Sequence, residues 1–197
     1  MLFDRQRLLL ALVDALEGAP AGTDFQKLLF LYTKEWEAEP SYDFVPYQFG
    51  SFSFSSYADK RKLIERGLLE DEPARWVLTA TGRLAGRGEK ALAERTRRFA
   101  AAHRLRGDAL IAEVYRRYPY YATRSKIAER VLPKAADRVA IAAAQPAAKG
   151  PGLVTLGYEG RSLEGYLNAL LKDSVTVLCD VRHNPLSRKY GSTTALS

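Results

Sequence analysis

The sequence has little of what disulfide-bonded, metal-binding and membrane proteins need. One cysteine, Cys179, excludes an intramolecular disulfide, and the two histidines, His103 and His183, have no partner at the spacing of a zinc site. The longest apolar runs, such as residues 8–13, are far shorter than the roughly 20 residues that span a bilayer, and the N-terminus is charged, unlike a signal region. We therefore predict a cytoplasmic protein with no membrane span, metal or cofactor.

Motifs of the common enzyme classes are also missing. The chain has neither a Gly-rich phosphate loop nor a dinucleotide fingerprint, and no GxSxG turn presents a serine nucleophile. An arginine near Cys179 can lower the pKa of its thiol, but the apolar run around this residue favours a small buried side chain over a nucleophile. Whether the protein is an enzyme stays open at this stage.

The positive charge is concentrated in the middle of the chain. The 197 residues have a formal net charge of +7. Residues 1–82 contain 9 Lys/Arg and 13 Asp/Glu, whereas residues 83–138 contain 15 Lys/Arg and 6 Asp/Glu. Such a basic stretch can attract a polyanion through its summed field and through counterion release. A solvated helical surface rich in arginine is the alternative interpretation.

Residues 1–82 are predicted to form a winged helix-turn-helix domain. Apolar spacing predicts a helix over residues 4–17, a second that begins at Thr23 or Asp24 and ends before Pro40, and a third that ends at Gly67. One of Ser53, Ser55 and Ser56 is expected to cap the third helix. Extended chain with a turn is expected over 42–52, and two short strands, over 68–70 and 75–79, are expected to form the wing. The order of these elements is typical of winged-helix proteins.

The third helix of such a domain can enter the DNA major groove. We expect its outer face to contact phosphates without reading bases, because lysine and arginine on an exposed helix can neutralise the backbone. The candidate nucleic-acid-binding residues are Lys60, Arg61, Lys62 and Arg66. Residues 1–82 are net acidic, however, and a winged domain can equally bind a protein.

The rest of the chain is predicted to contain three parts. Residues 83–139 form a basic helical extension, residues 140–152 a linker of small residues, and residues 153–197 a small partial α/β unit. In that unit the strands Leu153–Leu156 and Val175–Val181 flank a helix over Ser162–Lys172, as in a βαβ crossover. The predicted fold class is therefore α+β.

Two aromatic groups have alternative interpretations. The aromatics between Tyr42 and Phe54 are expected to pack in the core, although they can also stack on single-stranded bases. Tyr118, Tyr120 and Tyr121 alternate with cations, which is compatible with a nucleic-acid patch. The neighbouring cations are Arg116, Arg117, Arg124 and Lys126.

Polar residues cluster around the predicted C-terminal strands, where open α/β sheets usually bind ligands. The turn over 157–162 can hold an anion at the start of the following helix, although a purely structural glycine turn is the favoured interpretation. Asp180 can act as an acid or base or can orient a neighbouring arginine. The candidate anion-binding residues are Arg161, Arg182, Ser187 and Arg188. An internal Asp–Arg ion pair is the alternative.

The runs TLGYEGRSLEGYLNALL and VTVLCDVRHNPLSRKYG, within residues 155–191, resemble the start of the domain of unknown function 488 (DUF488) family. The resemblance implies an α/β domain with a polar pocket, in a family without a settled activity. Members continue with further strands and helices after the SRK segment, whereas this chain ends at Ser197, so we expect a partial domain. A partner or the N-terminal part would then complete it.

Residues 26–82 more weakly resemble winged-helix modules of the Panacea or phage-associated antitoxin type, through a KLLFL helix, a YQFGSFS turn and a final LTATG. Taken together, these observations predict a DUF488-type, nucleic-acid-associated binding protein in a regulatory or defence setting. One alternative is an enzyme that acts on a phosphate-bearing or nucleic-acid substrate. Another is an antitoxin-like protein-interaction module, with a protein partner or a second copy of the chain.

Overall fold

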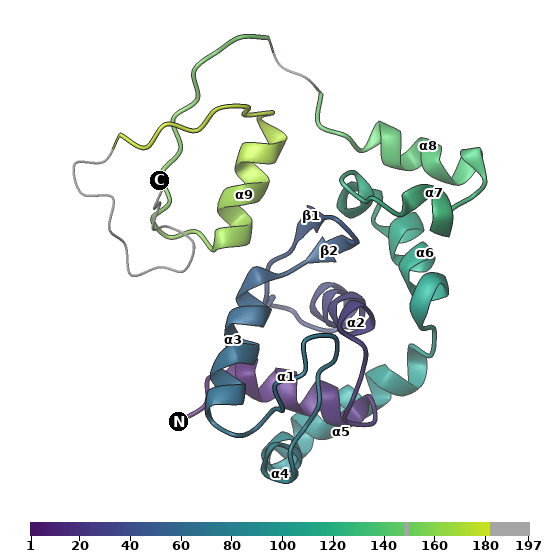
Figure 1. Cartoon of the computed structure of the whole chain (residues 1–197), viewed down its shortest axis with the longest axis vertical. Helices are drawn as coiled ribbons and strands as arrows, with labels where there is room; N and C mark the ends of the chain where they lie inside the picture. Colours follow the sequence, from purple (N-terminus) through teal and green to yellow (C-terminus); the bar gives the residue numbers. More distant parts are fainter. Residues whose placement is uncertain (148–149, 182–197) are drawn as a thin grey trace.

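The protein has an α+β fold in which helices predominate, as predicted (Figure 1). The structure, a computed structural model, describes residues 1–147 and 150–181. One antiparallel sheet in this part of the chain pairs β1 (Val45–Tyr47) with β2 (Gly50–Phe52). The helices are α1 (Asp4–Ala15), α2 (Gly22–Glu35), α3 (Phe54–Glu65), α4 (Ala80–Arg87), α5 (Lys90–Ala102), α6 (Gly107–Arg117), the 3-10 helix η1 (Pro119–Ala122), α7 (Ala128–Val131), α8 (Ala135–Ala143) and α9 (Leu163–Lys172).

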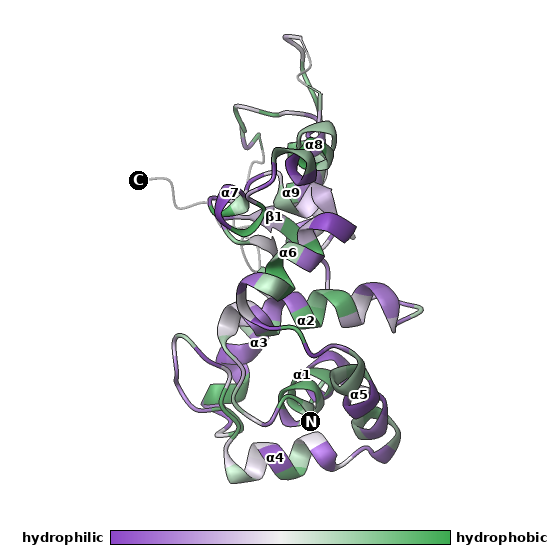
Figure 2. Cartoon of the chain, turned by 90° about the vertical axis from the view of Figure 1, so that its right-hand side faces the viewer, coloured by the Kyte–Doolittle hydropathy of each residue, from purple (hydrophilic) through white to green (hydrophobic). Residues whose placement is uncertain are grey.

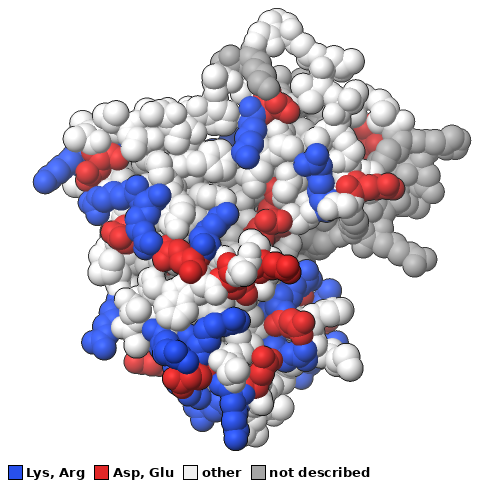
Figure 3. Space-filling model, turned by 180° about the vertical axis from the view of Figure 1, so that it is seen from behind, with Lys and Arg blue, Asp and Glu red and all other residues white. Residues whose placement is uncertain are grey.

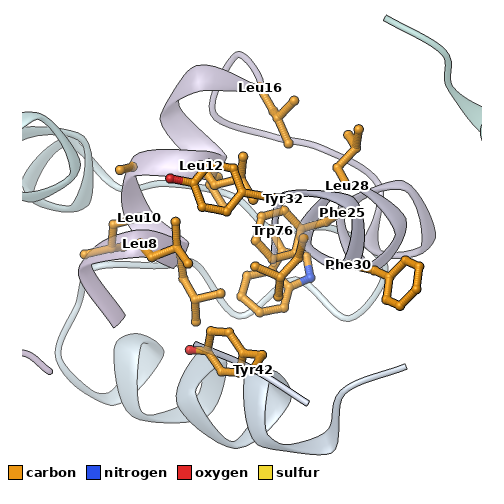
Figure 4. Close-up of a cluster of buried hydrophobic side chains, with 14 of the residues drawn as sticks. Leu8, Leu10, Leu12, Leu16, Phe25, Leu28, Phe30, Tyr32, Tyr42 and Trp76 are labelled. Carbon is orange, nitrogen blue, oxygen red and sulfur yellow. The ribbon is translucent and has the colours of Figure 1, made fainter. Parts of the chain in front are cut away.

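The main core forms around α1 and α2, whose apolar residues are nearly all buried. Figure 4 shows these side chains converging with Trp76, which comes from the loop after α3. The Trp76 ring lies against Phe25, with centroids 4.2 Å apart. Burial of one large apolar side chain contributes about 1.5–3 kcal/mol, so this cluster is the main source of stability. In Figure 2 the ribbon of α1 is largely hydrophobic, whereas α5 combines hydrophobic and hydrophilic residues.

The hairpin and α3 follow from local sequence signals. Gly50 is the first residue of β2, directly after the tight turn, and it adopts a φ of 92°, which favours glycine. A side chain at this position would also collide with the ring of Tyr115. Ser53 caps α3, because its hydroxyl accepts a hydrogen bond from the Ser56 amide. Gly67, at a φ of 67°, follows the helix in the left-handed conformation that was expected there.

The predicted two-stranded wing is reduced to a single bridge. Leu69 pairs with Leu78, and the Glu70 amide donates to the Val77 carbonyl at 2.9 Å. The rest of segment 68–79 is irregular. One reason is that Arg75 pairs instead with Ala21 before α2, which draws this end of the segment away from a hairpin.

The basic extension forms α4 to α8 and not one long helical run. The chain turns between α5 and α6 at residues 103–106, and α8 continues to Ala143, inside the segment predicted as a linker. A second, smaller cluster of buried residues forms where α6, α7 and α8 meet, and it contains Ile111, Tyr115, Leu132 and Ile141.

The predicted βαβ unit is wrong in its strands and right in its helix. Helix α9 forms where it was expected, and Ser162 caps it through a hydrogen bond from the Gly165 amide. Residues 153–156 and 175–181 are irregular, and Leu153, Val177 and Val181 are 94%, 81% and 89% exposed. Two isolated strands have no further strand to pair their open edges, and α9 packs against the N-terminal part of the chain instead of covering them.

Candidate functional site

Lys60 does not lie on the exposed face of α3, so the prediction that it contacts phosphates is wrong. Its side chain is largely buried, and Nζ donates to the carbonyls of Glu72 at 2.6 Å and Arg75 at 2.7 Å. The ammonium also lies 5.3 Å from the centroid of the Trp76 ring. Consecutive helical residues point about 100° apart, so Lys60 shares the inner face with Asp59 and Leu63 and not the outer face with its cationic neighbours.

The other three predicted cations of α3, Arg61, Lys62 and Arg66, are exposed. Arg66 donates to the Met1 carbonyl at 2.8 Å. The turn that follows α3 has the opposite charge, because residues 70–72 are three exposed acidic residues. Positive and negative side chains therefore lie close together at the C-terminal end of α3, and the negative ones disfavour close approach of a phosphate backbone there.

The N-terminus of α3 is covered by α9. The Glu164 carboxylate is fully buried, and it accepts hydrogen bonds from the Ser55 amide at 2.7 Å, the Ser55 hydroxyl at 2.9 Å and the Ser53 hydroxyl at 3.2 Å. A carboxylate at this position also interacts favourably with the helix dipole. Asn168, one turn further along α9, donates to the Phe44 carbonyl at 2.7 Å. The end of α3 that a nucleic acid would approach first is therefore occupied by the protein itself.

The predicted anion clamp is only partly described. Arg161 and Asp180 are both exposed, in the loops before and after α9. Arg182, Ser187 and Arg188 lie outside the described residues. The strands that were expected to bring these side chains to one sheet edge are absent from residues 153–156 and 175–181. Cys179 is exposed, contrary to the expectation that it is buried.

The three tyrosines that follow α6, of which two lie in η1, make contacts inside the protein. The Tyr118 hydroxyl donates to Glu35 at 2.9 Å, and the Tyr120 hydroxyl donates to Asn168 of α9 at 2.9 Å. The Tyr121 ring packs edge-on against Phe30, with centroids 4.6 Å apart. Tyr118 and Tyr121 therefore pack against the core, whereas Tyr120 lines a pocket of about 510 Å³ together with Arg124.

A cationic surface remains on α5 and on the corner between α5 and α6. We call it the basic α5 surface, and its members are Lys90, Arg97, Arg98, Arg104 and Arg106, all exposed. Arg95 of the same helix is exposed as well, but it donates to the Tyr32 hydroxyl at 2.6 Å and is not counted in this surface. Arg97 and Arg98 share one acidic partner, Glu94. Arg104 and Arg106 donate to backbone carbonyls, and neither forms an ion pair with a described residue. Figure 3 shows that Lys and Arg on the rear face form several groups with acidic side chains between them.

A pocket of about 320 Å³ lies between the start of α2, the β1–β2 hairpin and residues 73–74. Four of its lining residues are aromatic, and Lys27 of α2 is a buried cation beside them. Burial lowers the pKa of the Lys27 amine from 10.5 to about 7, and the nearby Asp24 carboxylate only partly opposes this shift. Lys27 was not among the residues predicted for a functional site. Its position among apolar residues of the second helix was the one available signal.

No protein-family model, curated protein or solved structure matches the chain. The resemblances to the DUF488 family and to Panacea-type modules therefore stay predictions. None of the described helices is long and apolar enough to cross a membrane.

Proposed function

We propose that this protein is a nucleic-acid-associated binding protein that contacts phosphates through the basic α5 surface. The observation that supports the proposal is the outward display of five cations on one helix and the corner after it, in the segment where the positive charge is concentrated. Exposed Lys and Arg attract nucleic acid through counterion release without reading its sequence.

The basic α5 surface is a better candidate than α3 for two reasons. Lys60 is used for internal hydrogen bonds, and α9 covers the N-terminus of α3 through Glu164. Arg104 and Arg106, in contrast, have no described carboxylate to displace before they bind a phosphate. Arg61, Lys62 and Arg66 would add weaker contacts from a separate face.

The test is the affinity of the full chain for duplex DNA across a salt series, for the wild type and two double variants. We expect Arg104→Ala/Arg106→Ala to weaken binding on all sequences alike and to reduce the slope of log K against log[salt] by about 2. The matched control, Arg61→Ala/Lys62→Ala, removes two exposed cations from α3 and should change the slope less. The proposal would be contradicted if the chain did not bind DNA at low salt, or if the control variant lost more affinity than Arg104→Ala/Arg106→Ala.

A second candidate, a protein-interaction module, is favoured by the exposed apolar residues of segments 153–156 and 175–181. Such segments can add a strand to a sheet edge of another chain, and a second copy of this protein offers the same segments. If they pair, sedimentation should detect a dimer whose fraction rises with concentration and falls in Val177→Asp, but not in Thr176→Asp. A monomer at every concentration would rule out this self-pairing.

A further inference from the structure

The pocket beside Lys27 contains buried hydrogen-bond donors that the protein leaves without acceptors. Lys27 Nζ donates one hydrogen bond, to the Ser51 carbonyl at 2.9 Å, and forms no other with a described residue. An ammonium has three N–H groups, so two are unused. The hydroxyl of Ser51 is fully buried and has no hydrogen-bond partner. Both residues line the pocket.

Buried donors without acceptors are costly, at about 1–3 kcal/mol each and more when charged, so a group of this kind in a native protein requires a reason for its presence, such as a function at that site. Asp24, the acidic residue nearest to Lys27 in the sequence, does not accept these hydrogen bonds. Its carboxylate accepts one from the Gly107 amide at 2.8 Å and forms no ion pair with Lys27. A ligand that pairs with the Lys27 ammonium and the Ser51 hydroxyl must supply acceptor oxygens. A negative charge on the ligand would strengthen its binding further.

The walls select for a planar apolar body. Four aromatic residues line the pocket, and the rings of Phe52 and Tyr57 stack with centroids 5.1 Å apart. Tyr47 and Phe49 of the hairpin are partly exposed, at 39% and 48%, beside the opening. A volume of about 320 Å³ lies at the small end of ligand pockets.

We propose that this pocket binds a small aromatic carboxylate, with the carboxylate on Lys27 and Ser51 and the ring against the aromatic walls. The site is distinct from the basic α5 surface, so the proposal does not depend on nucleic-acid binding. A bound ligand would contact both the hairpin and residues 73–74, because both line the pocket.

The experiment is a titration of the full chain at pH 6, where Lys27 is charged, followed by backbone amide NMR. Phenylacetate is the probe, and phenylacetamide is its uncharged counterpart of the same shape. We expect saturable shifts around residues 22–27, 47–52 and 73–74 with millimolar or tighter affinity, and at least about tenfold weaker binding of the amide, as for loss of one charge-assisted hydrogen bond.

Variants separate recognition by Lys27 from nonspecific ring binding. Lys27→Met and Ser51→Ala should each weaken phenylacetate binding, Lys27→Met by about tenfold or more, while thermal unfolding confirms that both variants fold. Lys34→Met, in which a lysine of the same helix is replaced, should leave the affinity unchanged. Equal affinity for the acid and the amide, or shifts outside these residues, would overturn the assignment. Because the comparison of the two probes uses the wild type, it stands even if a variant fails to fold.

Discussion

At the residue scale, buried charges determine the strongest local effects, and Lys27 is the clearest case. Its pKa is about 7 in the folded chain and 10.5 when exposed. Between these values the unfolded state binds more protons than the folded state, so stability rises with pH across this window. Below pH 7 both states are protonated, and the full penalty of burying the ammonium is present.

Lys27→Met should therefore stabilise the protein most below pH 7. Each pKa unit corresponds to about 1.4 kcal/mol, and the unpaired Ser51 carbonyl in the variant offsets part of the gain. We expect the free energy of unfolding to increase by roughly 2 kcal/mol at pH 6, the gain to disappear between about pH 8 and 9, and the variant to be less stable than the wild type near pH 10. Urea unfolding at several pH values measures this difference. A gain that does not depend on pH would contradict the shifted pKa.

Asp59 illustrates a buried charge with complete pairing. Its carboxylate contacts Arg5 Nε at 2.7 Å and accepts hydrogen bonds from Gln6 at 2.9 Å and the Tyr42 hydroxyl at 3.0 Å. Burial of the phenol and, after it, this carboxylate raise the pKa of Tyr42 well above its usual value. The network connects α3 to α1 and to the segment before β1.

Asp59→Ala should reduce the free energy of unfolding by about 3 kcal/mol, because it leaves buried donors unpaired. Glu65→Ala is the matched control, since Glu65 is an exposed acidic residue of the same helix; it should change stability by less than about 0.5 kcal/mol. Chemical denaturation of both variants measures the difference. Similar losses would mean that the network contributes little.

At the element scale, α9 is the segment whose placement depends most on one side chain. Glu164 accepts three hydrogen bonds from the cap of α3, while Ser162 donates to Asp43 at 2.6 Å and Asn168 donates to Phe44. The apolar residues of α9 are only partly buried. Polar contacts therefore determine where α9 docks.

Glu164→Ala should release α9 without unfolding the core. Loss of about 1.4 kcal/mol of docking free energy raises tenfold the fraction of molecules in which α9 is detached from α3. Trypsin should then cleave at two exposed residues, Arg161 before α9 and Lys172 at its end, at least several times faster than in the wild type. Glu159→Ala, which removes an exposed carboxylate from the preceding loop, should not change the rate. Unchanged cleavage in Glu164→Ala would mean that other contacts position α9.

At the scale of the whole molecule, stability is distributed unevenly. Central residues of α1 and α2 are fully buried, whereas residues 153–157 and 175–181 form no regular hydrogen-bonded structure. Hydrogen exchange should therefore be slowest at residues 9–12 and 28–31 and close to the unprotected rate in the two irregular segments. The measurement requires dilute protein, because strand pairing between copies would also protect these segments. Protection that increases with protein concentration would indicate such pairing.

The sequence by itself determined the elements whose signals are local. Helical periodicity located α1, α2, α3 and α9, and capping and turn residues such as Ser53, Gly67 and Ser162 determined where helices begin and end. The α+β class and the concentration of charge in residues 83–138 also followed from the sequence, because composition and periodicity do not depend on contacts between distant segments.

Only the tertiary structure decided which polar groups are buried and which are free. Lys60 was read as part of an exposed cationic run, yet it turns inward because residues 72–75 lie beside it and supply carbonyl acceptors. Glu164 and Lys27 are buried by segments 109 and 24 residues away in the sequence. The apolar runs over 153–156 and 175–181 have the composition of strands, but a strand needs a neighbour to accept its hydrogen bonds, and α9 docks elsewhere. Burial and pairing of this kind depend on contacts between distant segments, which no local pattern encodes.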